Sequence, residues 1–296
     1  MSRAATPATA ATFFSRSGAR STSPADLESK RLRLEEILRG LGRVLIAYSG
    51  GVDSTVLLVE AHRVLGERAC GVIAQSPSLP AAELTAALSL ARDRGIPARV
   101  IRTQEMEREE YRANRPDRCF HCKTELFEKL ENLAREESWD AIAYGAVTDD
   151  LGDVRPGMVA ADRHRVSAPL LEAGLSKVEI RMLARRLELH VWDKPQSACL
   201  ASRIPHGSEV TAEKLKQVEL GEAALREKLG LRIVRLRHEG RKARIEVDPA
   251  DIPRLELPEQ KDAILAIVQQ LGFAELEIDP KGYRRVDPLP PTVQEG

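Results

Sequence analysis

The first part of the chain alternates short apolar stretches with longer segments in which apolar residues recur at helical spacing. The short stretches predict strands over residues 44–48, 71–75, 99–102 and 141–146. The helical segments cover residues 27–38, 55–65, 82–94, 123–137 and 176–189. Strands that alternate with helices in this way predict an α/β fold, a parallel sheet with helices on both faces. Ligands of such folds bind at the carboxyl ends of the strands.

The order of elements changes after Gly207. The remaining segments predict, in chain order, a helix, two strands, two helices and a strand, over residues 211–229, 232–238, 243–247, 250–255, 259–271 and 273–278. We therefore expect two domains, a nucleotide-binding α/β domain over 27–207 and a small α+β domain over 208–285. A chain of 296 residues is long enough for both.

Both ends of the chain are predicted to be tails, residues 1–26 and 286–296. The first is rich in Ala, Ser and Thr and has no acidic residue before Asp26. This composition predicts a poorly ordered segment, and a transit peptide is the alternative. No apolar run approaches the length of a transmembrane helix, so we expect no membrane partner.

The overall charge and the cysteine count narrow the function classes. The chain has 45 basic and 45 acidic residues, so its net charge gives no signal for a nucleic-acid partner. Four cysteines are too few for a disulfide scaffold in a chain of this size. A Cys-x-x-Cys pair among them points instead to metal or redox chemistry in a reducing compartment, and we expect a cytoplasmic protein.

A candidate phosphate-binding loop follows the first predicted strand. Its residues are Ser49, Gly50, Gly51, Val52, Asp53 and Ser54, and an amphipathic helix comes directly after them. Paired glycines let the backbone approach a ligand closely, and the start of the helix offers unpaired N–H groups to a phosphate. The two serine hydroxyls can donate further hydrogen bonds, and Asp53 can hold Mg²⁺.

The loop lacks the Gly-Lys-Ser/Thr ending of a Walker motif, since no lysine lies between Arg43 and Lys123. The run SGGVDS instead resembles the pyrophosphatase loop of the N-type ATP pyrophosphatases, which have the adenine nucleotide alpha hydrolase-like fold. The resemblance implies that ATP is cleaved between its α- and β-phosphates and that a carboxylate or carbonyl oxygen is adenylated. Asp53 then becomes a candidate catalytic residue.

Three cysteines form a second candidate site. Cys119 and Cys122 are a Cys-x-x-Cys pair just before the helix predicted at 123–137, and Cys199 lies far along the chain. Three thiolates could hold a [4Fe–4S] cluster, and the pair alone could act as a redox dithiol. Structural zinc would need a fourth ligand, for which His121 is poorly placed. The residues alone leave these three interpretations open.

The hairpin of the small domain carries a third candidate site. Strand alternation puts Arg235 and Arg237 on one face of the first strand and Arg244 and Glu246 on one face of the second. If the hairpin aligns these faces, the guanidinium groups suit a substrate with phosphate and carboxylate groups. The alternative is an ordinary solvated outer face of a sheet.

A closer resemblance joins these sites. SGGVDS, the segment Ala198-Cys-Leu-Ala-Ser-Arg-Ile-Pro-His-Gly207 and the arginine-rich hairpin together resemble LarE, over most of residues 27–285. LarE proteins are ATP-dependent sulfur transferases that make the sulfur-bearing precursor of the nickel-pincer nucleotide cofactor of lactate racemase. The resemblance implies that ATP adenylates a carboxylate of pyridinium biscarboxylate mononucleotide and that a sulfur nucleophile then attacks the acyl carbon.

The resemblance also implies roles for individual residues. Cys199 is the implied catalytic cysteine, and the implied substrate-binding residues are Arg203, Glu222, Arg235, Arg237 and Glu246. The better-known LarE branch consumes one cysteine as sulfur donor and lacks the Cys-x-x-Cys pair. Because Cys119 and Cys122 are present, this chain is similar to the branch that binds a [4Fe–4S] cluster through three cysteines. A nickel-insertion protein and a homo-oligomer are the implied partners.

Two other functions fit parts of the pattern. A tRNA thiolase with a pyrophosphatase loop would also use cysteine-bound clusters, but it would need a basic surface. A nucleotide- and metal-binding sensor without turnover would produce neither AMP nor pyrophosphate.

Overall fold

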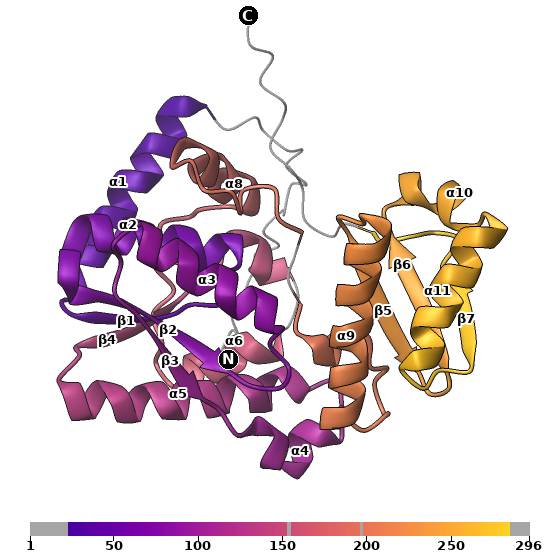
Figure 1. Cartoon of the computed structure of the whole chain (residues 1–296). Helices are drawn as coiled ribbons and strands as arrows, with labels where there is room; N and C mark the ends of the chain where they lie inside the picture. Colours follow the sequence, from indigo (N-terminus) through magenta and orange to yellow (C-terminus); the bar gives the residue numbers. More distant parts are fainter. Residues whose placement is uncertain (1–22, 153–154, 196–197, 285–296) are drawn as a thin grey trace, which may run out of the picture.

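The computed structural model of the chain describes residues 23–152, 155–195 and 198–284. A four-stranded parallel sheet has the order β3-β2-β1-β4 (Figure 1). Its strands, in chain order, are β1 (Val44–Ala47), β2 (Ala69–Gln75), β3 (Ala98–Arg102) and β4 (Ala141–Tyr144). The predicted α/β fold with a parallel sheet is confirmed.

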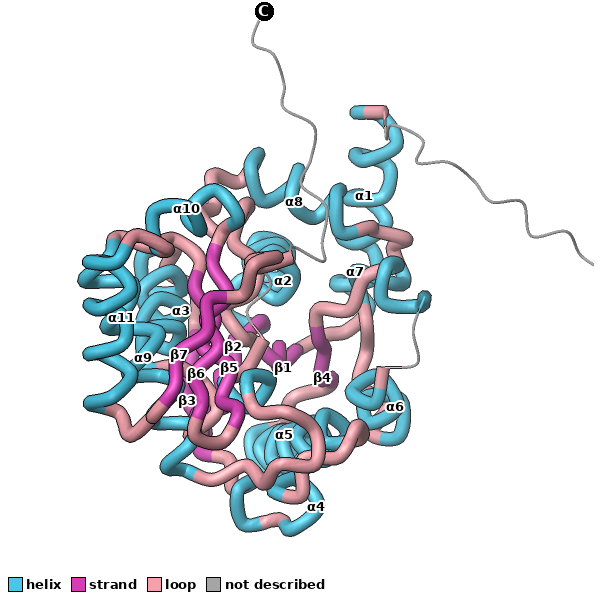
Figure 2. The backbone as a smooth tube through the Cα atoms, turned by 90° about the vertical axis from the view of Figure 1, so that its right-hand side faces the viewer, coloured by secondary structure: helices cyan, strands magenta, loops and turns pink. Residues whose placement is uncertain are grey.

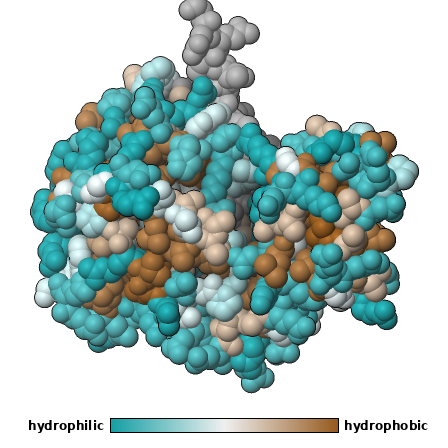
Figure 3. Space-filling view, in the orientation of Figure 1, coloured by the Kyte–Doolittle hydropathy of each residue, from teal (hydrophilic) through white to brown (hydrophobic). Residues whose placement is uncertain are grey.

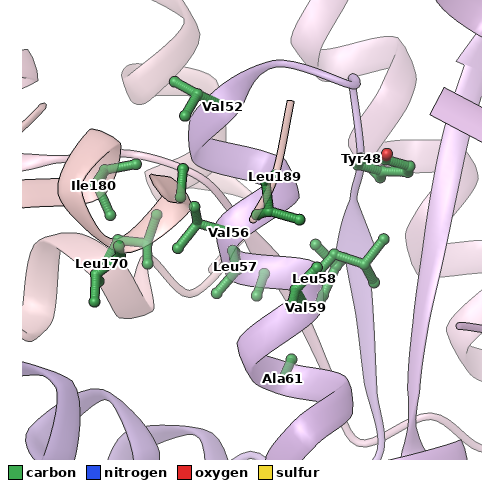
Figure 4. Close-up of a cluster of buried hydrophobic side chains, with 14 of the residues drawn as sticks. Tyr48, Val52, Val56, Leu57, Leu58, Val59, Ala61, Leu170, Ile180 and Leu189 are labelled. Carbon is green, nitrogen blue, oxygen red and sulfur yellow. The ribbon is translucent and has the colours of Figure 1, made fainter. Parts of the chain in front are cut away.

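Helices cover both faces of this sheet. One face carries α1 (Pro24–Gly40), α2 (Val52–Leu65), α3 (Ala81–Asp93) and α8 (Lys177–Arg186), and the other carries α5 (Arg118–Glu137) and α6 (Pro156–Arg163). The alternation along β1 explains this arrangement. Val44 and Ile46 join the core under α2, whereas Leu45 and Ala47 join the core under α5. Figure 4 shows side chains of α2 in the first of these cores, among them Val56 and Leu57.

A second, smaller sheet follows near the carboxyl end of the chain. It has the order β5-β6-β7, formed by β5 (Val234–Glu239), β6 (Lys242–Val247) and β7 (Glu275–Ile278). The first pair is antiparallel and the second is parallel. Helices α9 (Ala212–Leu229), α10 (Ile252–Leu255) and α11 (Pro258–Gln270) accompany it (Figure 2). Its apolar residues form a second core, which also includes Tyr111, Leu200 and Ile204.

Two short helices connect these elements, α4 (Glu109–Arg112) and α7 (Pro169–Glu172). Short 3-10 turns complete the path, and two of them, Glu105–Glu107 and Leu200–Arg203, lie next to the candidate site. The face shown in Figure 3 is mostly hydrophilic, with apolar residues gathered over the region of β2 and β3. Within the described ranges, no helix combines the length and the apolar character that crossing a membrane requires.

Several element boundaries differ from the sequence prediction, and two of these differences affect the interpretation. The helix predicted from Lys123 begins at Arg118, so Cys119 and Cys122 lie inside its first turns. Apolar spacing misses this turn because the buried Arg118 side chain, rather than an apolar residue, anchors it. Helix α1 begins at Pro24 with a capping box on Ser23, so residues 24–26 of the predicted tail are helical. The rest of that tail, 1–22, and the tail at 286–296 lie outside the described residues.

Candidate active site

The candidate phosphate loop joins β1 to α2 at the carboxyl edge of the parallel sheet. The Ser54 hydroxyl accepts a hydrogen bond from the Ser49 amide at 3.2 Å and lies 3.1 Å from the Ser49 hydroxyl. Gly50 has a φ of 71°, a left-handed conformation that glycine adopts without strain. A Cβ at Gly50 would also stand 3.0 Å from the Cβ of Ala87 in α3. The loop is therefore a tight turn that requires glycine at this position.

The start of α2 is open to an anionic ligand. Gly51 is the N-cap and makes no side-chain capping bond, so the first amide groups of the helix lack this partner. Gly145, just after β4, packs against this helix start, where an added Cβ would come within 2.8 Å of the Ser54 nitrogen. The amides and the positive end of the helix dipole together favour a phosphate group at this corner.

Asp53 points into a buried, charged corner beside the loop. Its Oδ2 accepts a hydrogen bond from Lys177 Nζ at 2.5 Å, and its Oδ1 is buried with no hydrogen-bond partner among the described residues. Burial raises the pKa of the Asp53 carboxyl, although the Lys177 charge acts in the opposite direction. An unpartnered carboxylate oxygen next to a phosphate site is suited to a hard cation such as Mg²⁺.

Two lysines from distant segments supply the positive charge that the loop itself lacks. Lys177 contacts Asp53, and Lys194 donates to the Gly50 carbonyl at 3.1 Å and forms an ion pair with Glu83. The sequence analysis missed both as parts of the phosphate site. The sequence around Lys177 indicates only that it follows Ser176, the N-cap of α8, and this position gives no indication that Lys177 contacts the phosphate loop.

One cavity connects the phosphate loop with the cysteines and the arginines. Its lining includes Ser49, Cys122, Cys199, Arg203 and Arg235. The apolar part of the wall comes from β2 and the turn after it, with Val72, Ile73, Ala74, Leu79 and Pro80. Segments far apart in the sequence are thereby brought to a single space.

The three candidate cysteines differ in position. Cys122 and Cys199 are half-buried and line the cavity, whereas Cys119 is exposed, one turn earlier in α5, and outside its lining. Burial raises the pKa of the Cys122 thiol to about 12. In the part of the chain that the structure describes, no three Cys, His, Asp or Glu side chains are grouped closely enough to hold a metal ion. The predicted [4Fe–4S] site is therefore not confirmed.

A buried polar clamp fixes the Cys199 segment against the start of α5. Asn114, fully buried with a φ of 53°, donates to the carbonyls of Pro205 at 2.8 Å and Ser208 at 2.9 Å. Arg118 donates to the Ala201 carbonyl at 2.9 Å and also contacts the Asn114 side chain. The sequence analysis did not single out either residue, because the clamp joins segments about ninety residues apart.

Arg203 and Glu222 form a buried ion pair between the two parts of the cavity wall. The Arg203 Nε lies 2.8 Å from Glu222 Oε1, and both side chains are 3% exposed. Arg203 also donates to the Cys199 carbonyl at 3.0 Å. The pair thus ties the cysteine segment to α9. Arg235 lines the same cavity, and its guanidinium lies over the ring of Tyr283, 5.3 Å from the centroid.

The arginine-rich hairpin has the predicted common face. Arg235 pairs with Glu246 across β5 and β6, and Arg237 pairs with Arg244. Arg237 binds Glu246 through two hydrogen bonds, at 2.9 and 2.6 Å, and Arg244 contacts the same carboxylate at 2.9 Å. A second cavity, lined by Arg203, Arg235, Arg237 and Glu246, adjoins the first and shares Arg203 and Arg235 with it. All five predicted substrate-binding residues therefore line one or both of these neighbouring cavities.

Comparison with known proteins finds relatives that align with most of the chain. No protein-family model matches. The pyridinium-3,5-bisthiocarboxylic acid mononucleotide synthase of Lactiplantibacillus plantarum is 32% identical over 269 residues, 88% of this chain and 94% of that enzyme. An uncharacterised protein of Synechocystis is 41% identical over 87% of this chain and 96% of the relative. An uncharacterised protein of Methanocaldococcus jannaschii is 27% identical over 82% of this chain and 91% of the relative. With such identity and coverage to a characterised LarE enzyme, the chain belongs to the LarE family of sulfur transferases.

Proposed function

We propose that this protein adenylates a carboxylate of pyridinium biscarboxylate mononucleotide with ATP and converts it to a thiocarboxylate, in nickel-pincer cofactor biosynthesis. The observation that carries the proposal is the single cavity bordered by the phosphate loop, two cysteines and three arginines. Adenylation and sulfur transfer require the same acyl carbon to meet both ATP and sulfur. A shared cavity supplies that proximity.

In the first half-reaction, residues Ser49 to Ser54 would hold the phosphates of ATP. A substrate carboxylate oxygen forms a bond to the α-phosphorus, the bond between that phosphorus and the bridging oxygen to the β-phosphate breaks, and pyrophosphate leaves. Asp53 would hold Mg²⁺ through its buried Oδ1, and the ion would neutralise phosphate charge. Lys177 and Lys194 lie beside the loop and would add positive charge at the leaving pyrophosphate.

In the second half-reaction, Cys199 would lie next to the activated acyl carbon. If Cys199 is the donor, its sulfur forms a bond to that carbon and its thiol proton goes to water. The bond between the acyl carbon and the bridging oxygen breaks, and AMP leaves with that oxygen and the bonding electrons. Cleavage of the Cβ–Sγ bond, with loss of the Cα proton, then releases the thiocarboxylate and leaves dehydroalanine. This route consumes the enzyme after one turnover.

We further propose that Cys119, Cys122 and Cys199 hold a [4Fe–4S] cluster, as in the three-cysteine branch of the family. Their chemistry fits, because thiolates are the ligands of such clusters. Two of the thiols line one cavity, and the third precedes Cys122 by one turn of α5. When bound, the cluster would supply an iron atom that carries the sulfur to be transferred, so that Cys199 need not be consumed.

Substrate binding is assigned to the arginines and their partner acids. Arg235 and Arg237 would bind the phosphate of the mononucleotide, and Arg203 would bind a carboxylate. Glu222 and Glu246 would orient these guanidinium groups, since each already accepts hydrogen bonds from an arginine of the set.

The partners and the domain division are also proposals. A nickel-insertion protein and a homo-oligomer are expected from the family alone. We place the division between the nucleotide-binding domain and the small substrate domain at residues 207 and 208. Light scattering of the purified chain measures the oligomer, and a mass equal to one chain would contradict it.

The proposed reaction is tested with protein purified without oxygen and supplied with ATP, Mg²⁺, sulfide and the biscarboxylate mononucleotide. We expect AMP, pyrophosphate and thiocarboxylate in equal amounts, and loss of all three in Asp53→Asn. Exposed Asp162→Asn, which removes the same charge outside the site, is the control and should keep activity. Formation of ADP and phosphate would contradict the proposal.

The cluster is tested separately by iron and labile sulfide analysis. We expect roughly four irons per chain, as in one [4Fe–4S] centre, and their loss in Cys119→Ala. Stoichiometric zinc without labile sulfide would contradict the cluster. One turnover per chain, with dehydroalanine at Cys199 in the protein mass spectrum, would assign the sacrificial route instead.

A further inference from the structure

Glu105 is a buried acid whose side chain faces the cavity. It opens the 3-10 turn Glu105–Glu107, shortly after β3 ends, and it is only 2% exposed. Its Oε1 accepts a hydrogen bond from the Ser78 hydroxyl at 3.2 Å. Its Oε2 is buried and has no hydrogen-bond partner among the described residues. Glu105 also belongs to the lining of the cavity that holds Cys122 and Cys199.

The carboxyl group of Glu105 has no cationic partner among the described residues, unlike the other acids in the lining. Glu83 is paired with Lys194, and Glu222 is paired with Arg203 and Arg226. Glu105 forms no ion pair with any residue in the described ranges. Burying an unpaired carboxylate is costly, so a cationic ligand that reached Glu105 would gain binding energy from it.

The cavity lining around Glu105 also carries positive charge. Besides Glu83, Glu105 and Glu222, the charged residues of the lining are the cations Lys123, Arg203, Arg226 and Arg235. These suit the phosphate and carboxylates of a substrate, but they would repel a positive ring.

We propose that Glu105 recognises the positive charge of the pyridinium ring of the substrate. The inference rests on the proposed function, in which the substrate combines a cationic aromatic ring with anionic groups. ATP offers no cation for this site. A bound metal ion fits less well, because no group of three suitable ligands includes Glu105 in the described part of the chain. Glu105 is thereby a residue that selects the oxidised, charged ring over a neutral one.

The test compares two ligands that differ mainly in ring charge, nicotinamide mononucleotide and its reduced dihydropyridine form. Affinities are measured by calorimetry for the wild type, Glu105→Gln and Glu107→Gln. We expect the wild type to prefer the charged ring at least about tenfold, because opposite charges attract strongly at a partly desolvated site. Glu105→Gln keeps the size of the side chain and an acceptor for Ser78, and it should abolish the preference. Glu107, exposed on the same turn, is the matched control and should retain it.

An unchanged preference in Glu105→Gln would overturn the inference, and so would an equal loss of affinity for both ligands, which would indicate a packing role. The proposed function is judged by thiocarboxylate formation in the wild type. If product forms while the wild type shows no charge preference, only the Glu105 assignment fails. If neither mononucleotide binds and no product forms, both fail.

Discussion

The Glu222 carboxylate is a buried acid held by three different residues of the candidate site. It accepts hydrogen bonds from Arg203, Arg226 and the Leu236 amide while its side chain is 3% exposed. A buried ion pair adds little net stability over apolar residues, but removal of one partner leaves an uncompensated charge. Glu222 therefore fixes the geometry of the cavity wall, and substitution of Glu222 or of its main partner should destabilise the fold.

Arg203→Ala should destabilise the fold strongly for this reason. We expect a loss of about 3–5 kcal/mol in the free energy of unfolding, because Glu222 would stay buried without its main partner. Arg226→Ala removes a partner that is 40% exposed and should cost less than about 1 kcal/mol. Urea denaturation of both variants checks this, and equal losses would show that Arg203 is not the dominant partner.

The same carboxylate predicts a pH dependence of stability. Burial alone would raise the pKa of Glu222, but the charge and hydrogen bonds of Arg203 outweigh it and hold the pKa below the ordinary value of 4.5. A group whose pKa is lowered on folding adds stability above its unfolded pKa, and that stability is lost as the pH falls through the folded value. Below about pH 4.5, the urea concentration at the unfolding midpoint should therefore fall less in Glu222→Gln than in the wild type. Parallel curves would contradict this assignment.

The sequence predicted those residues whose role is local. The phosphate loop follows from its own six residues, and the shared face of Arg235, Arg237 and Glu246 follows from strand alternation. Lys177, Lys194 and Glu105 could not be predicted in this way. Each meets the site only through the packing of segments far apart in the chain.

Among the elements, the start of α2 is held in place by the close approach of Gly145, the residue just after β4. Gly145→Ala should disturb it, because the new Cβ would meet backbone atoms of Asp53 and Ser54 at 2.8–3.1 Å. We expect a loss of about 1–3 kcal/mol in stability and weaker ATP binding. Gly152→Ala, where an added Cβ meets nothing within 4 Å, is the matched control and should change neither. Normal ATP affinity in Gly145→Ala would contradict the placement of the nucleotide.

Most element types were predicted correctly, but helices α4, α6 and α7 were not predicted, and the start of α5 was predicted wrongly. Apolar periodicity finds a helix where Leu126 and Leu130 are buried, but its first turn is held by the polar contacts of Arg118. Periodicity carries no information about such contacts. The error matters because it moves Cys119 and Cys122 from a loop into a helix, where their separation is fixed by helical geometry.

In the whole molecule, the two sheets and their helices meet around the candidate site. The first cavity takes its lining from the parallel sheet, from α5 and from α9 and β5 of the smaller part. Neither sheet alone supplies both a phosphate loop and the arginines. A tRNA thiolase would instead need a basic surface, whereas this chain has equal numbers of basic and acidic residues.

The central claim, that a substrate carboxylate attacks ATP before sulfur arrives, is tested most directly by labelling that carboxylate with heavy oxygen. We predict that one labelled oxygen appears in AMP for each thiocarboxylate formed and that pyrophosphate carries none. Label-free AMP accompanying product, or product formed without consumption of ATP, would contradict the account.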